Sequence, residues 1–161
     1  AVVRKREMDL NELVETQAES FAFRVEHTGG QITTEITAVD SAIYVDETHF
    51  PNAISNLLDN AVKYRKPDQP LNIHLRTWNE GKNVCFSITD NGLGIKRENQ
   101  KKIFDQFYRV HTGNVHDVKG FGLGLAYVKN IVSLNDGEIK LESELDKGST
   151  FTIKLPAFNN A

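Results

Sequence analysis

The stretch Leu71-Asn-Ile-His-Leu-Arg-Thr-Trp78 alternates apolar and polar residues, and Val84-Cys-Phe-Ser-Ile-Thr-Asp90 repeats the pattern after a short break. Strict alternation over this length is typical of a β-strand that buries one of its faces. The break, Asn79-Glu-Gly-Lys82, has the composition of a tight turn. The sequence therefore predicts a β-hairpin with one face in the core.

The segments on both sides of this hairpin predict helices and further strands. Before it, periodicity predicts a helix, two short strands and a second helix, over 11–27, 31–39, 42–45 and 48–66. Asp46 or Thr48 is expected to cap the second helix. After the hairpin we expect a short helix, a loop, a third helix and a closing hairpin, over 98–107, 110–119, 122–134 and 138–155. The fold class is α+β, a two-layer α/β sandwich with a mixed or antiparallel sheet and helices on one face.

Composition limits the possible classes of protein. A chain of 161 residues with 39% hydrophobic and 25% charged residues fits a single globular domain, 1–161. The net charge of −3 and the dispersed lysines and arginines give no sign of nucleic-acid binding. The lone cysteine suits the cytoplasm, and no apolar stretch reaches the length of a membrane span. Because the first residue is not Met, we expect residues 1–8 to be the remnant of an upstream linker or helix.

The second predicted helix carries a row of polar residues beside its apolar face. Asn52, Asn56, Asn60 and Lys63 recur at helical spacing. A solvated face is the simplest interpretation, but asparagine is a poor helix former and is not favoured on such a face. Asparagine oxygens suit Mg²⁺, and a lysine one turn on can neutralise phosphate. The row is therefore a candidate binding surface.

Two glycine-containing segments are further candidates. Asp90 ends a predicted buried strand, and its carboxylate could accept a hydrogen bond from an amino group; Gly92 and Gly94 would let the backbone approach a flat base. A plain Asx turn remains the alternative. The segment Gly120-Phe-Gly-Leu-Gly-Leu125 opens a predicted helix, whose free amides can bind an anion; a flexible hinge is the alternative. Its glycine spacing and the absence of a following Lys-Ser/Thr argue against the Rossmann and Walker loops.

The segment Phe104-Asp-Gln-Phe-Tyr-Arg109 places two aromatic residues three apart, which are most simply core anchors. Arg109 lies at the edge of the expected loop, from which it could move onto a phosphate. The five histidines show no metal-binding spacing.

In order and spacing these segments resemble the catalytic and ATP-binding domain of bacterial sensor histidine kinases, which has the Bergerat ATP-binding fold. The resemblance covers nearly the whole chain. It includes the lead-in Met8-Asp-Leu-Asn-Glu-Leu13 and the closing Gly148-Ser-Thr-Phe-Thr-Ile-Lys-Leu-Pro156. It implies a mixed sheet of about five strands, with ATP held between helices under a lid over 110–119.

The resemblance also implies roles for individual residues. Asn60 matches the Mg²⁺-coordinating asparagine, Lys63 a phosphate-contacting lysine and Asp90 the aspartate that binds the adenine amine. Arg109 matches an arginine implicated in phosphate handling, and Asn56 and Lys63 join it as the candidate catalytic residues. The other residues expected beside the nucleotide are Tyr64, Gly92, Gly94, Ile95, Phe107, Gly120, Gly122, Leu123, Gly124 and Leu125. Phe121 departs from the family, in which a small Ser or Thr is common.

Two absences narrow the implied function. Relatives that hydrolyse ATP or phosphorylate serine have a glutamate base one turn before the metal asparagine, where this chain has Asn56. Neutral imidazole needs no such base, so Asn56 favours transfer to histidine. The acceptor motif of the family, a histidine followed by an acidic residue and Thr-Pro, does not occur here.

We therefore expect a domain that binds Mg²⁺ and ATP and transfers phosphate to a histidine on an adjoining dimerisation domain. The implied further partner is a response regulator, the parent is expected to be a homodimer and this fragment a monomer. A degenerate module that binds nucleotide or a partner without transfer is the alternative, and a hydrolase or serine kinase is disfavoured by Asn56.

Overall fold

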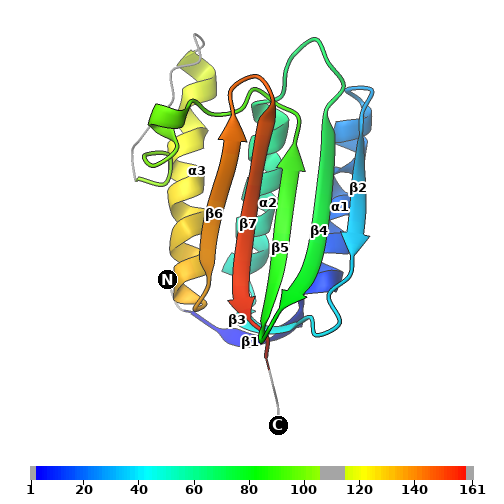
Figure 1. The fold of residues 1–161 in the computed structure, drawn as a ribbon, viewed down its shortest axis with the longest axis vertical. Helices are drawn as coiled ribbons and strands as arrows, with labels where there is room; N and C mark the ends of the chain where they lie inside the picture. Colours follow the sequence, from blue (N-terminus) through cyan, green and yellow to red (C-terminus); the bar gives the residue numbers. More distant parts are fainter. Residues whose placement is uncertain (1–2, 106–114, 159–161) are drawn as a thin grey trace.

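The structure of the protein is a computed structural model that describes residues 3–105 and 115–158, with residues 115–123 described by their backbone alone. Its main layer is a five-stranded sheet, and helices cover one face of that sheet (Figure 1). The strands are β2 (Gln31–Ile36), β4 (Asn72–Glu80), β5 (Asn83–Asp90), β7 (Gly148–Pro156) and β6 (Glu138–Glu144), in that spatial order. β2 pairs parallel with β4 and the other pairs are antiparallel. The prediction of a two-layer sandwich with a mixed sheet is confirmed.

The hairpin of β4 and β5 buries the face that the alternation predicts, and in β5 Cys85 and Ser87 of the opposite face are buried as well. Ile73 and Leu75 of β4 and Phe86 and Ile88 of β5 are each at most 1% exposed and point into the core. Glu80 pairs with Asn83, so the turn itself is only Gly81 and Lys82. Gly81 has φ +58°, a conformation that glycine adopts without strain.

The covering layer contains α1 (Leu10–Glu26), α2 (His49–Lys63) and α3 (Val115–Leu134). α1 matches its predicted span to within one residue, whereas α2 ends at Lys63, three residues before its predicted end. Each helix buries an apolar face, with Val14, Phe21 and Val25 in α1 and Phe50, Ile54 and Leu57 in α2. α3 packs against α2, and α1 packs against α2, β2 and β4. These contacts form the core between sheet and helices.

The start of α2 is held by Asp46 rather than by Thr48. Oδ1 of Asp46 accepts hydrogen bonds from the amides of Thr48 (2.9 Å) and His49 (2.6 Å), whereas Thr48 makes no side-chain cap bond. The His49 amide, together with those of Arg4 and Thr48, holds the pKa of Asp46 below its usual range. Asn135 Oδ1 accepts from the Asp46 amide at 3.0 Å, so this residue also joins α2 to the end of α3.

Half of the segment 1–8, which we expect to be the remnant of an upstream linker or helix, belongs to a strand of this domain. Lys5–Asp9 forms strand β1, which pairs antiparallel with β3 (Ala42–Asp46) in a separate two-stranded sheet. The Arg4 amide fixes the register because it donates to Asp46 Oδ2 at 2.7 Å. A strand of mainly charged residues forms here because β3 supplies its hydrogen-bond partners.

Two further expectations need correction. The helix expected over 98–107 is only the 3₁₀ turn η1 (Arg97–Asn99) followed by turns to residue 105; residues 106 and 107 lie outside the described part. α3 begins at Val115, so residues 115–119, expected to be loop, are helical, and residues 110–114 are not described. Each glycine in a helix costs only about 1 kcal/mol relative to alanine, which packing of α3 on α2 can offset. Gly120, Gly122 and Gly124 therefore lie inside the helix rather than at its first turn.

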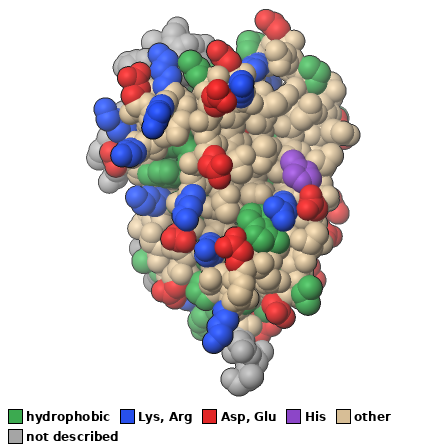
Figure 2. All heavy atoms as spheres, viewed as in Figure 1, with side chains coloured by type: hydrophobic (Ala, Val, Ile, Leu, Met, Phe, Trp, Pro, Cys, Tyr) green, Lys and Arg blue, Asp and Glu red, His purple; other side chains and the backbone are tan. Residues whose placement is uncertain are grey.

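None of the described helices covers the other face of the sheet, and acidic and basic side chains are mixed on it (Figure 2). Glu35 pairs with His74 and Arg76, both at 3.3 Å, and Lys154 pairs with Glu80 at 3.4 Å. In the pairs of Arg76 with Glu35 and of Lys154 with Glu80, the two opposite charges neutralise each other on a solvated surface. Among the described helices, none combines the length and the apolar character needed to cross a lipid bilayer.

Candidate functional site

The polar row of α2 runs from the surface into the seam between α2 and α3. Asn52 is exposed, Asn56 is partly buried and Asn60 is only 7% exposed. The Nδ2 atom of Asn60 has no hydrogen-bond partner among the described residues. A Cβ atom placed on Gly124 of α3 would lie 3.8 Å from this nitrogen, so the two residues face each other across the seam.

An unpaired buried amide is a costly feature that calls for an explanation. Leaving such a group without a partner costs about 1–3 kcal/mol. Oδ1 of asparagine is a hard ligand of the kind that Mg²⁺ accepts, and Nδ2 can donate to a phosphate oxygen. Because Mg²⁺ bound with a nucleotide takes only one or two protein ligands, the single residue Asn60 fits a site for that ion.

Lys63 lies one turn beyond Asn60 and is paired with a carboxylate. Its Nζ atom lies 3.2 Å from Oδ2 of Asp59, and its side chain is half exposed. The other oxygen of Asp59, Oδ1, lies 3.4 Å from a guanidinium nitrogen of Arg24 on α1. The sequence indicated Lys63 but gave no signal for Asp59 or Arg24, because a charged residue on a helix surface is ordinary and Arg24 lies on another element.

Asp90 ends β5 with its side chain on the helix-covered side of the sheet, as expected from its place two residues after the buried Ile88. Its Oδ1 accepts from the Gly92 amide at 2.8 Å. Burial raises the pKa of this carboxyl to about 6, although the amides of Gly92 and Ser149 lower it. Asp90 is therefore a desolvated acceptor at the end of a rigid strand, which is suited to binding an amino group.

This pKa predicts how stability depends on pH. The folded protein holds the Asp90 proton up to about pH 6, whereas the unfolded chain releases it near pH 3.8, the ordinary pKa of an aspartic acid side chain. Stability should therefore fall as pH rises from about 4 to 6 and then level off. We expect Asp90→Asn to be more stable than the wild type at pH 7 and equally stable below pH 4, as measured by urea unfolding across this range. A difference in unfolding free energy that is the same at every pH would contradict the raised pKa of Asp90.

The glycines after Asp90 lie in a junction of three segments. The Leu93 amide donates to the carbonyl of Tyr64 at 3.0 Å, and the Asp146 amide donates to the carbonyl of Leu93 at 2.7 Å. Gly94 has φ +70°, and a Cβ atom there would lie 2.0 Å from the carbonyl oxygen of Glu144. The role of Gly94 that the structure describes is thus the close approach of two backbones, and its predicted contact with a base stays a prediction.

Two residues that the sequence did not indicate hold this junction together. Ser143 Oγ accepts from the Ile95 amide at 2.8 Å. Gln100 donates from Nε2 to the carbonyl oxygens of Ile95 and Ser143, both at 2.8 Å. Gln100 lies in the segment expected to be a short helix, so its spacing gave no indication of this role. These bonds position the loop that follows Asp90.

The remaining predicted site residues fall into three groups. Tyr64 is partly buried and packs on the core, and Ile95 and Leu125 are 6% and 0% exposed. Gly120, Gly122 and Leu123 lie in the first half of α3, where the structure describes the backbone only. Phe107 and Arg109 lie outside the described residues. The structure thus brings together Asn60 and Gly124, and separately Tyr64, Asp90, Gly92 and Gly94.

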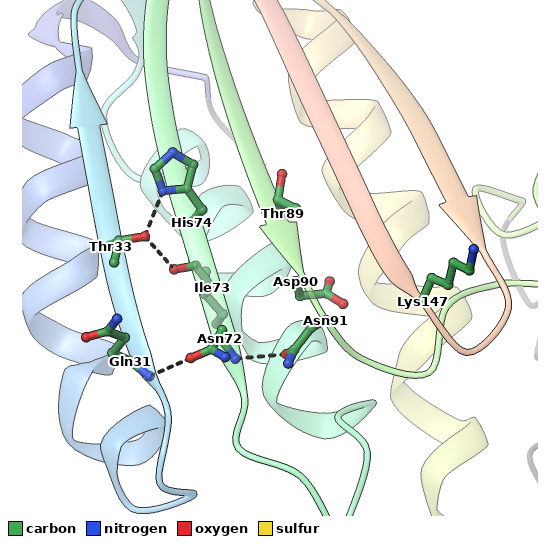
Figure 3. Close-up of a pocket in the computed structure, with 9 residues that line it drawn as sticks. All are labelled: Gln31, Thr33, Asn72, Ile73, His74, Thr89, Asp90, Asn91 and Lys147. Carbon is green, nitrogen blue, oxygen red and sulfur yellow. Dashed lines mark hydrogen bonds between the residues drawn. The ribbon is translucent and has the colours of Figure 1, made fainter.

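A hollow of about 360 Å³ lies at the ends of β2, β4 and β5, and Figure 3 shows the residues that line it. It opens on the uncovered face, on which Thr33, His74 and Thr89 lie. Thr33 Oγ1 and His74 Nδ1 are hydrogen-bonded at 2.7 Å, and the Asn72 amide donates to Asn91 Oδ1 at 2.8 Å. Because these groups already bind one another, the hollow is a poorer candidate than the seam that buries Asn60.

Comparison with known proteins identifies relatives over most of the chain. The family model of the histidine kinase-, DNA gyrase B- and HSP90-like ATPases matches residues 45–159 of the sequence. The sensor protein RprX of Bacteroides fragilis (strain YCH46) is 53% identical over 160 residues, which are 99% of this chain and 31% of RprX. The chain thus spans less than a third of the length of this curated relative.

Solved structures show the same fold. Full-length ShkA in complex with AMPPNP superposes with a TM-score of 0.81 at 26% identity, covering 100% of this chain and 33% of ShkA. The nucleotide-free catalytic domain of the histidine kinase ThkA has a TM-score of 0.78 at 23% identity, and the match covers 96% of each chain. With its family match, its relative and its fold in agreement, the chain belongs to the family of histidine kinase-, DNA gyrase B- and HSP90-like ATPases.

Proposed function

We propose that this chain binds Mg²⁺ and ATP along the α2–α3 seam and is the catalytic domain of a two-component sensor histidine kinase. The observation that carries the proposal is Asn60, a buried amide on α2 with an unpaired Nδ2 atom among the described residues. RprX is a sensor protein and the ShkA structure holds the nucleotide analogue AMPPNP, which supports both parts of the proposal.

In this proposal each residue has a distinct task. Asn60 holds Mg²⁺ through Oδ1, and Lys63 contacts the phosphates. Asp90 accepts a hydrogen bond from the adenine amine at the other end of the site. When bound, Mg²⁺ neutralises charge on the transferred phosphoryl group. Asn56 supplies no base, which is compatible with transfer to a neutral imidazole and not with activation of water.

The acceptor histidine belongs to an adjoining dimerisation domain in this proposal. The parent protein is then a homodimer, and the phosphoryl group passes on to a response regulator. ThkA has been solved in complex with the response regulator TrrA, which supports such a partner.

The decisive experiment mixes this chain with the adjoining dimerisation domain of its own parent protein and with labelled ATP, with and without Mg²⁺. We expect acid-labile phosphohistidine only with Mg²⁺. Tight ATP binding without any transfer would instead favour a nucleotide-binding module without kinase activity.

The proposed contact of Asp90 predicts a loss of affinity. A hydrogen bond to a charged group contributes about 1.5–3 kcal/mol, so Asp90→Ala should weaken ATP binding at least about tenfold. Isothermal titration of the folded variant measures this change, with circular dichroism as the check of folding. Unchanged ATP affinity would remove Asp90 from the nucleotide site.

A further inference from the structure

A chain of three charged residues links α1 to the polar row of α2. Each oxygen of Asp59 faces a different cation, with Oδ2 3.2 Å from Lys63 Nζ and Oδ1 3.4 Å from Arg24. The guanidinium of Arg24 lies over the ring of Phe21, 4.1 Å from its centre. Phe21 is only 3% exposed and belongs to the core. Arg24 is thus held at a fixed place on α1 and in turn holds Asp59.

The position of Asp59 on the helix decides the direction in which it draws Lys63. With about 100° of rotation per residue, Lys63 lies about 40° from Asp59 around α2, and Asn60 lies about 60° further in the same sense. Asn60 faces α3 across the seam, whereas Asp59 contacts Arg24 of α1. The ion pair therefore draws the Lys63 ammonium toward α1 and away from the buried amide of Asn60.

We propose that Asp59 is a positioning residue, which withholds Lys63 from the nucleotide site until a phosphate competes for it. The inference rests on the proposed role of Lys63 in binding phosphate. A triphosphate with several negative charges attracts the ammonium more strongly than a single carboxylate does. When Lys63 moves to the phosphate, Arg24 remains beside Asp59 and compensates its charge. The two contacts of Asp59 thus have different tasks, since the contact with Arg24 is permanent and the contact with Lys63 is exchangeable.

The expected effects are small and have a definite sign. Exposed ion pairs contribute about 0.2–1 kcal/mol, which corresponds to a factor of about 1.5 to 5 in affinity. Asp59→Asn keeps the shape of the side chain and releases Lys63, so it should tighten Mg²⁺·ATP binding by such a factor. Arg24→Gln leaves Asp59 to Lys63 alone and should weaken binding by a similar factor. Damage to the fold would not tighten binding, so the first result separates positioning from a structural role.

The experiment measures dissociation constants of Mg²⁺·ATP and of adenosine for both variants, alone and combined with Lys63→Met. The matched control is Glu26→Gln, which removes one negative charge from an exposed residue near the end of α1 that makes no described ion pair. We expect Glu26→Gln to leave ATP affinity unchanged, and adenosine, which has no phosphate, to bind all variants equally. Both effects on ATP should vanish in the Lys63→Met background.

Each other outcome overturns the inference, and the outcomes distinguish it from the proposed function. If Asp59→Asn tightens ATP binding equally in the wild-type and Lys63→Met backgrounds, the cause is the general loss of a negative charge and not the positioning of Lys63. If Lys63→Met weakens ATP binding but Asp59→Asn leaves it unchanged, Asp59 does not position Lys63, whereas the proposed nucleotide site is retained. If Lys63→Met leaves ATP affinity unchanged, or if the wild type binds no ATP, the role of Lys63 in the proposed function fails as well.

Discussion

Replacing Asn60 by leucine is expected to stabilise the fold and to slow phosphotransfer strongly. Leucine has nearly the shape of asparagine, and it removes a buried Nδ2 atom that has no described partner. Removing such a group should raise the free energy of unfolding by about 1–3 kcal/mol. A Cβ atom on the facing residue, Gly124, would still be 3.8 Å from the asparagine nitrogen, so leucine has room in the seam. The same change removes the proposed Mg²⁺ ligand and should lower the transfer rate at least about 100-fold.

The prediction is specific because it combines a gain in stability with a loss of phosphotransfer. Urea unfolding measures stability. Labelled ATP, mixed with the adjoining dimerisation domain that carries the acceptor histidine, measures phosphotransfer. Asn52→Ala is the control, because Asn52 belongs to the same polar row but is exposed; it should change stability by less than about 1 kcal/mol and retain transfer. A stabilised Asn60→Leu variant that still transfers phosphate would show that the unpaired amide has no role in the site. A strongly destabilised variant would show that Asn60 has a structural partner.

Local patterns predicted most of the elements, and contacts between distant segments explain what they missed. The β4–β5 hairpin needs only alternation and a turn, and both are visible in the sequence. The parallel pairing of β2 with β4, and the place of β5 next to β7, join segments that are far apart, so periodicity alone left the sheet mixed or antiparallel. Strand β1 exists because β3 pairs with it, and its charged sequence carries no strand pattern. α3 extends to Val115 although its glycines have a low helix propensity, so local propensity did not predict where this helix begins.

The candidate site was predictable where it depends on one helix or on one motif. Asn60 was found because three asparagines at helical spacing are unusual, but its burial depends on α3 and could not be read from that spacing. Asp59 is adjacent to Asn60 and was not indicated, since its significance depends on Arg24, which lies 35 residues earlier. Gly94 was interpreted as space for a ligand. In the structure the missing side chain also leaves room for the backbone of Glu144, a contact between distant segments that the motif did not indicate, and the contact with a base stays a prediction.

The contact between Gly94 and Glu144 makes Gly94→Ala a substitution with a large expected loss of stability. At φ +70° an alanine is strained by about 1–2 kcal/mol. Its Cβ atom would lie 2.0 Å from the carbonyl oxygen of Glu144, and a backbone atom cannot move aside as a flexible side chain can. The loop would have to shift away from the β6–β7 turn, at the expense of the hydrogen bond from Asp146 to Leu93. We expect a total loss of about 3–5 kcal/mol in the free energy of unfolding.

Gly81→Ala provides the matched control, because it shares the backbone strain without the collision. Gly81 has φ +58°, and a Cβ atom there would have nothing within 4 Å. Its loss should therefore be only the strain of about 1–2 kcal/mol. The difference between the two variants in urea unfolding isolates the contact between Gly94 and Glu144. Equal losses would mean that backbone conformation alone requires glycine at position 94, and the loop after Asp90 would then be free to move without the β6–β7 turn.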